Sequence, residues 1–340
     1  MKKYLIIFIC LNVWVGYCYS QTTLTSAKEE KTDSTKMAYL ERAAIAYPLF
    51  RQGAISTEVI GNANTTGELF GNPLFKGKVN LTREKANINI PLIEWGNNNL
   101  AGSVSYMNQH YNITQVQDYN AQVPVRDMNF NTQTIGFSLS YTRRDSLFNQ
   151  PVIYNGTIAG FTNQLSSVQK VSYFGALIFP IKHADNNSFK IGVVVIIDPS
   201  SFFPVLPYFS YWHKFEGGNA ELFIDLPSRV ALRRQLTTNS WLTFSTEQTS
   251  TFSFFNINEP PLPQNAQNTL IELKTGPSYE YRVAKKVILG VYGGVFSTID
   301  SRLSKHNVDW SNYYIRNHTG AAPYLNFTVS FLPFVKPLNK

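Results

Sequence analysis

The amino-acid sequence predicts an all-β protein: a transmembrane antiparallel up-and-down β-barrel of about 14 strands, with roughly 12 as the alternative, behind a cleaved signal peptide. Three observations lead to this prediction. From Gly53 onward, apolar residues tend to recur at every second position, the period of a strand with two different faces. Short and long connections alternate along the chain. Charged residues make up only 15% of the chain, against roughly 25% in soluble domains, while aromatic residues make up 14%.

The first residues have the order of a secretory signal peptide. Lys2 and Lys3 form a positive start, and Tyr4–Val15 is an apolar run too short to span a bilayer as a helix. Small residues then allow cleavage after Ser20. Residues 1–20 are therefore expected to be removed from the mature protein.

Both cysteines of the chain, Cys10 and Cys18, lie inside this signal peptide. Cleavage after Ser20 leaves a mature protein without disulfides, thiol nucleophiles or thiolate metal ligands. A lipoprotein modified at Cys18 is the alternative, but the bulky Tyr17 directly before it disfavours that modification.

The rest of the chain divides into three parts. Residues 21–52 are expected to be a polar periplasmic lead-in, in which Met37–Ala46 can form a short helix. Residues 53–334 are expected to be the barrel, and residues 335–340 a C-terminal tail. The longest apolar run after the signal peptide, Ile191–Ile197, has the length of a strand, so spanning by helices is not expected.

The clearest alternation lies at residues 134–142, TIGFSLSYT. Ile135, Phe137, Leu139 and Tyr141 fall on one face, and small polar residues fall on the other. The last strand, near residues 325–331, repeats this pattern. One face of each strand is therefore expected to meet lipid and the other the barrel interior.

The connections predict which rim each strand end occupies. Short turns are expected around residues 96–98, 184–187, 216–219, 237–239 and 284–285, and long loops at 61–84, 112–131, 255–267 and 300–319. In outer-membrane barrels the short turns face the periplasm. Many tyrosines and tryptophans fall near expected strand ends, where aromatic girdles occur; Trp212 and Trp241 are among them.

Several charged residues are expected to point into the lumen. This candidate set comprises Lys190, Glu221, Asp225, Arg229, Arg233, Glu272, Lys274, Glu280 and Arg282. Two interpretations stay open: the charges line an open lumen and bias the passage of solutes, or they form ion pairs that plug a small barrel.

No enzyme motif appears in the sequence, and the five histidines are scattered. We therefore expect no catalytic residue, no cofactor and no metal site. The net charge of +8 suits anionic lipids, lipopolysaccharide phosphates or anionic solutes as partners, rather than nucleic acid. The barrel-assembly machinery is a further expected partner, because the chain ends in an aromatic-rich strand.

Three segments resemble an uncharacterised family of Gram-negative outer-membrane β-barrels, a domain-of-unknown-function group: Tyr47–Gln52, Asn87–Leu92 and Glu221–Arg234. The resemblance implies the fold and a location in the outer membrane, and carries over no site residue. The first functional hypothesis is a porin-like passive pore or solute-uptake protein. The alternative is a closed structural or adhesion barrel that binds a partner through its outer loops, and a membrane-embedded hydrolase ranks third.

Overall fold

The computed structural model describes residues 33–201, 203–217, 219–256 and 265–339. The predicted signal peptide and the beginning of the lead-in lie outside these described residues.

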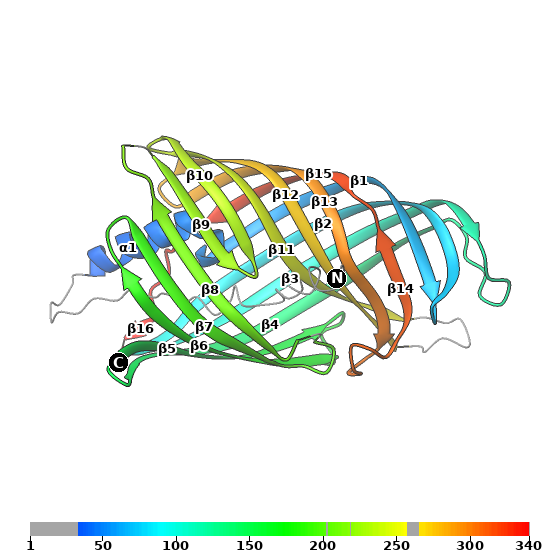
Figure 1. The fold of residues 1–340 in the computed structure, drawn as a ribbon, viewed down its shortest axis with the longest axis horizontal. Coiled ribbons are helices and arrows are strands. Elements are labelled where there is room, and N and C mark those ends of the chain that lie inside the picture. Colours follow the sequence, from blue (N-terminus) through cyan, green and yellow to red (C-terminus); the bar gives the residue numbers. More distant parts are fainter. Residues whose placement is uncertain (1–32, 202, 218, 257–264, 340) are drawn as a thin grey trace, which may run out of the picture.

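The described strands form one antiparallel sheet that closes on itself into a barrel (Figure 1). In chain order they are β1 (Gly53–Leu69), β2 (Asn72–Trp95), β3 (Asn98–Asp118), β4 (Met128–Leu147), β5 (Gln150–Thr162), β6 (Lys170–His183), β7 (Asn187–Ile197), β8 (Val205–Lys214), β9 (Ala220–Leu226), β10 (Arg229–Thr237), β11 (Ser240–Asn256), β12 (Asn265–Ala284), β13 (Val287–Lys305), β14 (Tyr313–Thr319) and β15 (Ala322–Phe331).

The ring closes through a position that two strands share. β14 and β15 follow each other between β13 and β1, and each pairs with both of these neighbours. The ring therefore has 14 strand positions, which confirms the predicted fold and excludes the alternative of roughly 12. A two-residue strand, β16 (Leu338–Asn339), pairs in parallel with β2.

The outer surface of the barrel is apolar where the sequence predicted it. Phe137, Leu139 and Tyr141 are 38–45% exposed on β4, while Thr134 and Ser140 are buried on the other face. A closed sheet leaves no backbone group unpaired in lipid, and an even ring with an apolar exterior is the architecture of outer-membrane barrels. The protein is an outer-membrane β-barrel.

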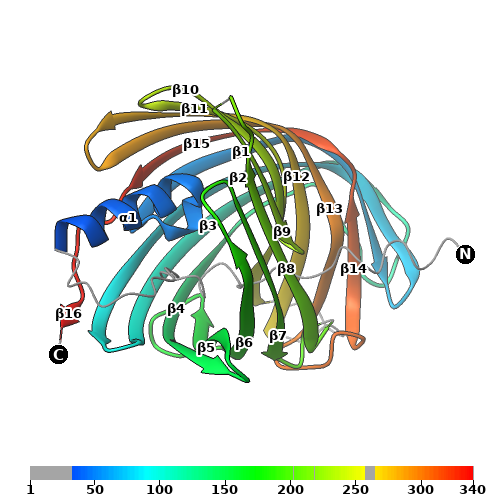
Figure 2. The same cartoon turned by 60° about the vertical axis from the view of Figure 1, so that its left-hand side comes forward.

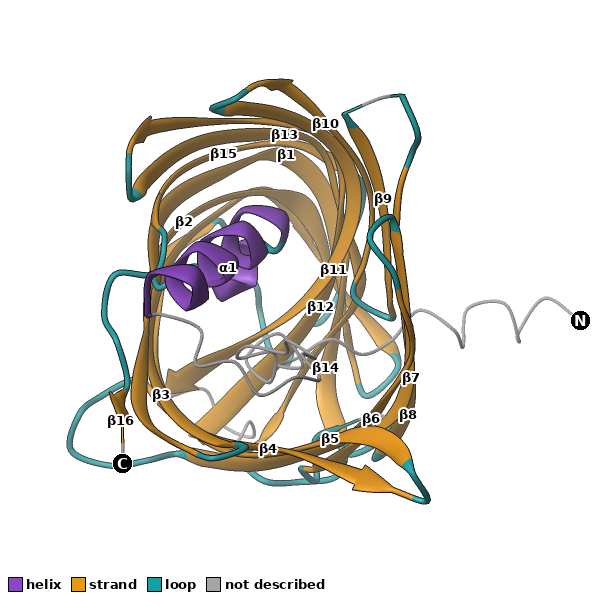
Figure 3. Cartoon of the chain, turned by 90° about the vertical axis from the view of Figure 1, so that its left-hand side faces the viewer, coloured by secondary structure: helices purple, strands orange, loops and turns teal. Residues whose placement is uncertain are grey.

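The N-terminal segment lies inside one mouth of the barrel, as Figures 2 and 3 show. It consists of helix α1 (Asp33–Ala46) and the short helix η3 (Pro48–Phe50). The expected short helix at Met37–Ala46 thus begins four residues earlier, and it packs against the wall instead of leading past it: Ala44 is buried against Trp241 and Leu332. Neither helix has the length and apolar character needed to cross a bilayer.

Two of the expected long loops are wrong. Residues 61–84 are mostly strand, because β1 and β2 continue to a tight turn at Phe70 and Gly71, where Gly71 has a φ of 82°. Most of residues 300–319 also belongs to β13 and β14. Because crossing a bilayer takes about 9 to 11 residues, these strands extend the barrel beyond the membrane at the outer rim.

The wall is uneven, because β9 and β10 are short. Their hairpin ends where Leu226 pairs with Phe209 and Arg229 pairs with Glu247. Toward the outer rim, described residues of β8 and β11 therefore have no strand partner on that side. Instead, β11 bends into the lumen and contacts β4: the hydroxyl of Thr134 donates to the carbonyl oxygen of Phe252 at 2.8 Å.

Close contact between β12 and β13 accompanies this bend. A Cβ at Gly276 would lie 2.0 Å from the carbonyl oxygen of Gly293, and Gly294 has a φ of +143°. Only glycine fits at such a contact. Gly276 lies in the interior of β12 and pairs with Ser245 of β11.

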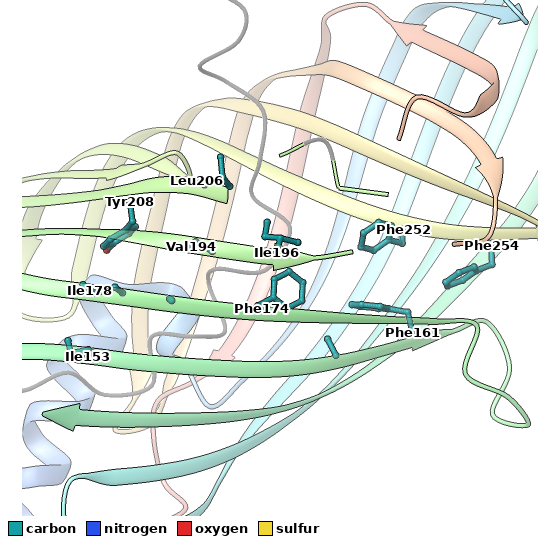
Figure 4. Packing of buried hydrophobic residues seen from close by; sticks show 12 residues of the cluster. Ile153, Phe161, Phe174, Ile178, Val194, Ile196, Leu206, Tyr208, Phe252 and Phe254 are labelled. Atoms are coloured by element: carbon teal, nitrogen blue, oxygen red, sulfur yellow. The ribbon is translucent and has the colours of Figure 1, made fainter. Parts of the chain in front are cut away.

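An apolar cluster fills the space between the bent β11 and strands β5–β8 (Figure 4). Phe252 and Phe254 of β11 pack against inward-facing residues of these strands, and the rings of Phe161 and Phe252 lie 5.4 Å apart. Strands β5–β8 therefore wrap the outer face of β11. The outer half of the molecule becomes a narrow barrel of β11, β12, β13, β14/β15, β1, β2, β3 and β4.

The exposed face of β15 gives a test of the lipid-facing assignment. Phe327 is 52% exposed, and its register partners are Thr57 and Val291. Phe327→Arg is expected to lower the free energy of unfolding by about 2–4 kcal/mol near the bilayer midplane, measured by urea unfolding in lipid vesicles. The control Phe327→Leu is expected to cost less than about 1.5 kcal/mol. Equal losses would contradict the assignment.

Candidate functional site in the barrel interior

All nine candidate charges lie on inner-facing positions of their strands. They fall into two groups. Glu272 and Lys274 belong to an ion cluster in the narrow outer half. The other seven lie nearer the rim that holds α1, and four of these line a cavity there: Lys190, Glu221, Arg233 and Arg282.

The central ion cluster joins opposite walls of the narrow barrel. It consists of Glu58, Arg83, Lys85, Glu272 and Lys274. The Arg83 Nη1 atom lies 3.1 Å from Glu58 and 2.6 Å from Glu272, and Lys274 pairs with both acids. Arg83 and Glu272 are fully buried, with side-chain exposures of 0%. These contacts favour the second interpretation, ion pairs that fill the lumen.

Polar side chains complete this cluster. Arg83 Nε donates to Gln109 at 2.8 Å, and the Gln109 amide donates to Ser253 on the bent part of β11 at 2.6 Å. Thr249 of β11 donates to Glu272 at 3.0 Å. Burial of a charge is tolerated only where such partners surround it, so the bend of β11 and the cluster depend on each other.

Apolar residues fill the lumen beyond the cluster, toward the outer rim. Ile60 and Ala63 of β1, Leu81 of β2 and Phe296 of β13 form a buried group there. A ring of about eight strands is just wide enough for side chains to fill its interior. These packed side chains occupy lumen space in the outer half of the described barrel.

Three arginines hold the C-terminal end of α1. Arg51 Nε donates to the carbonyl oxygen of Ala44 at 3.3 Å. Arg233 Nη1 donates to that of Ile45 at 2.5 Å, and Arg229 Nη2 to that of Ala46 at 3.5 Å. The last carbonyls of a helix lack partners within the helix and carry its negative dipole end, which favours cations. Arg229 and Arg233 were expected to line the lumen, and the structure uses both to anchor the helix.

A second buried ion pair fixes the segment after the helix. Arg51 lies 2.7 Å from Glu280 and donates to the Ser330 hydroxyl at 2.9 Å. Tyr292 donates to Glu280 Oε1, and Arg51 Nη2 donates to Glu280 Oε2 at 2.8 Å. The candidate residue Glu280 thus serves to hold the N-terminal segment in the barrel.

Two further candidates lie beside the same segment. Asp225 accepts a hydrogen bond from Ser210 at 2.7 Å. The guanidinium of Arg229 lies over the rings of Tyr47 and Phe223 at 5.8 and 5.1 Å. Burial raises the pKa of the Tyr47 phenol well above its ordinary value, so this group stays neutral.

A cavity of about 900 Å³ lies between α1 and the inner wall of the barrel, at the rim of short turns. Small residues such as Ser103 and Ser138 widen one side of it. Trp212, Trp241 and Phe223 form apolar parts of its lining. Trp212 and Trp241 were expected in the aromatic girdle, which is wrong, because their positions on β8 and β11 point inward.

The charges around this cavity are unequal. Among the described residues, six basic side chains line it but only two acidic ones. The basic residues are Arg42, Lys182, Lys190, Lys214, Arg233 and Arg282; the acidic ones are Asp185 and Glu221.

At the outer rim, a buried polar group that was not expected ties the loop after β7 to β6. Lys170 lies 2.7 Å from Asp198 and 2.6 Å from the Ser200 hydroxyl, and Ser172 also donates to Asp198. Burial opposes the charge of Asp198, but Lys170 and the hydroxyls outweigh it and lower the pKa of this carboxyl. Among the described residues, no three His, Cys, Asp or Glu side chains gather as a metal site would require.

No known family model and no curated protein matches the sequence, so the resemblance to a domain-of-unknown-function family stays a prediction. The fold is similar to an outer-membrane channel from Pseudomonas putida F1, with a TM-score of 0.33 and 8% identity over 83% of this chain and 95% of that one. It is also similar to the translocator domain of the autotransporter NalP from Neisseria meningitidis, with a TM-score of 0.29 and 9% identity over 88% and 94%. A FadL homologue of Pseudomonas aeruginosa gives a TM-score of 0.25 and 8% identity over 85% and 91%. TM-scores this low do not bear on function.

Substitutions in the central ion cluster test how it is balanced. Arg83→Leu is expected to lower the free energy of unfolding by about 3–5 kcal/mol, because Glu58 and Glu272 lose a shared buried partner. The double variant Arg83→Leu/Glu272→Leu is expected to be less destabilised, because it leaves the Lys274–Glu58 pair. Chemical unfolding of refolded protein measures both, and additive losses would contradict the coupling.

The Lys170–Asp198 pair predicts a pH dependence of stability. The pKa of Asp198 lies below its usual 3.8 in the folded protein, so its stabilisation is present above that value and is lost as the pH falls further. The difference in unfolding free energy between wild type and Asp198→Asn is expected to be constant above about pH 5 and to shrink below about pH 4. Parallel stability curves in acid would show that the pair contributes nothing.

Proposed function

We propose that this protein is a solute-uptake barrel, which holds a small solute in the cavity beside α1 and is not a permanently open pore. The cavity carries this proposal. Its volume of about 900 Å³ falls within the range of roughly 300–1,000 Å³ that is usual for small-molecule sites. Its lining combines apolar aromatic surfaces with a few inward-pointing charges, as such sites do.

The filled outer half supports uptake over passive conduction. The central ion cluster and the apolar residues beyond it occupy the axis of the narrow barrel. A structural or adhesion barrel could share this filling, but it has no need of a solute-sized cavity on the side away from its outer loops. The cavity therefore favours uptake over that alternative as well.

A solute that cannot pass along the axis needs a side passage, which we place above the short β9–β10 hairpin. Above this hairpin, β8 and β11 are not joined by strand pairing. On β11 the buried Gln248 Nε2 and Ser250 Oγ atoms have no hydrogen-bond partner among the described residues. Buried polar atoms without partners are costly, so these two mark the side of β11 where a polar molecule or water would be accommodated.

We also propose that the protein is not an enzyme. His183, Asp185 and Glu221 line the cavity, but among the described residues no hydrogen bond joins any of them to a nucleophilic side chain. Outer-membrane lipid and lipopolysaccharide are the proposed surroundings of its apolar exterior, and the barrel-assembly machinery is the proposed partner during insertion.

Planar-bilayer recording and proteoliposome uptake test this function together. Wild-type protein is expected to give no stable open steps in potassium chloride. Proteoliposomes are expected to take up at least one of three probes (arabinose, benzoate or benzylamine) faster than protein-free vesicles. Ser138→Trp, which narrows the cavity, is expected to slow that uptake several-fold. Leu139→Trp, at the adjacent outward-facing position, is the matched control and is expected to leave it unchanged.

Two results would overturn the proposal. Stable conductance steps in the wild type would favour an open pore. Folded protein with neither conductance nor uptake would favour a closed structural barrel.

A further inference from the structure

We propose that the cavity binds its solute through an anionic group, a carboxylate or a phosphate, held by the guanidinium of Arg233. The ligand class is a small organic anion with an apolar body. This inference rests on the proposed function, since it assumes that a solute occupies the cavity.

Arg233 has donors to spare. Its side chain lines the cavity and is only 3% exposed, and its Nη1 atom donates to the carbonyl oxygen of Ile45. Its Nε and Nη2 atoms have no hydrogen-bond partner among the described residues. Leaving donors of a buried charge unpaired is costly, and the edge that carries Nε and Nη2 matches the two oxygens of a carboxylate or phosphate.

Among the described residues, no acidic side chain forms a salt bridge with this guanidinium. Glu221 pairs with Arg233 in the strand register, yet no salt bridge within 4 Å joins the two side chains. Glu280, the other nearby acid, is held by Arg51 and Tyr292. Lys190 adds a second cation to the lining, and no ion pair of its ammonium group occurs among the described residues. The excess of basic over acidic lining residues therefore favours an anion over a cation or a neutral solute.

Aromatic residues beside Arg233 explain why an organic anion fits better than an inorganic one. The guanidinium lies 4.9 Å from the ring centroid of Trp241, which fixes its plane. Trp212, Phe223 and Ile153 also line the cavity and offer an apolar surface to the body of the ligand.

A purely structural role is the competing explanation. In that case Arg233 serves only to anchor α1, and ligand charge makes no difference to binding. The experiment therefore compares ligands of equal shape and different charge, a readout that anchoring of the helix alone would not change.

Binding is measured by tryptophan fluorescence and calorimetry on the full mature chain folded in detergent. The probes are benzoate, phenyl phosphate, neutral benzyl alcohol and cationic benzylamine. Benzoate or phenyl phosphate is expected to bind about tenfold or more tightly than benzyl alcohol, and the comparison of these two anions decides between carboxylate and phosphate. Arg233→Gln is expected to remove this preference, and Lys190→Gln to reduce it several-fold.

The matched control is Arg234→Gln, the next residue on β10. Arg234 is exposed and faces outward, so its loss is expected to leave the preference unchanged. If Arg233→Gln fails to fold, the anion site is still tested by two measurements. These are the preference of the wild type for anionic over neutral probes and the loss of that preference in Lys190→Gln.

Three outcomes would contradict the proposed anion site. Equal binding of benzoate and benzyl alcohol by the wild type would overturn it and leave the solute-uptake proposal standing. An equally strong effect of Arg234→Gln would assign the preference to surface charge and overturn the site. If none of the four probes binds and proteoliposomes take up no probe, both proposals fail together.

Discussion

The structure depends on one constraint: a guanidinium buried in the middle of the molecule must keep its anionic partners. Arg83 is fully enclosed, and its partners Glu58 and Glu272 come from β1 and β12. Its third partner, Gln109, is held by Ser253 on β11. These contacts form only if β11 and β12 leave the outer wall and cross toward β3 and β4. Because an unpaired buried charge is costly, the path of these two strands depends on these five side chains.

The division of the molecule into two halves follows from that path. Once β11 contacts β4, strands β5–β8 are left outside it, and their inward faces must be apolar to cover it, as Phe161 and Phe174 do. At the other rim β11 returns to the wall, the ring regains its full 14 positions, and the lumen widens. The cavity occurs at that rim because wall side chains alone cannot fill the wider ring, and α1 covers only part of the space.

Local sequence patterns predict the ring but not the bend. Alternation within residues 134–142 assigns each side chain to lipid or lumen, because that assignment depends only on the period of a strand. The bend has faint local signals, Gly276 followed by Pro277 and the pair Gly293–Gly294. Arg83 was missed because residues 61–84 were interpreted as a loop. Its partner Glu272 is 189 residues away, a separation at which no periodicity shows that two residues meet across a lumen.

For the basic residues of β10, the sequence predicted the direction of the side chains correctly but not their contacts. Arg229 and Arg233 do face the lumen, but the nearest negative charge is the C-terminal dipole of α1 and not a passing solute. A helix terminus carries only about half a unit charge, whereas a carboxylate carries a full one. An anion on the Nε and Nη2 edge of Arg233 would share the guanidinium whose Nη1 atom holds Ile45, so one side chain would both anchor the helix and bind the solute beside it.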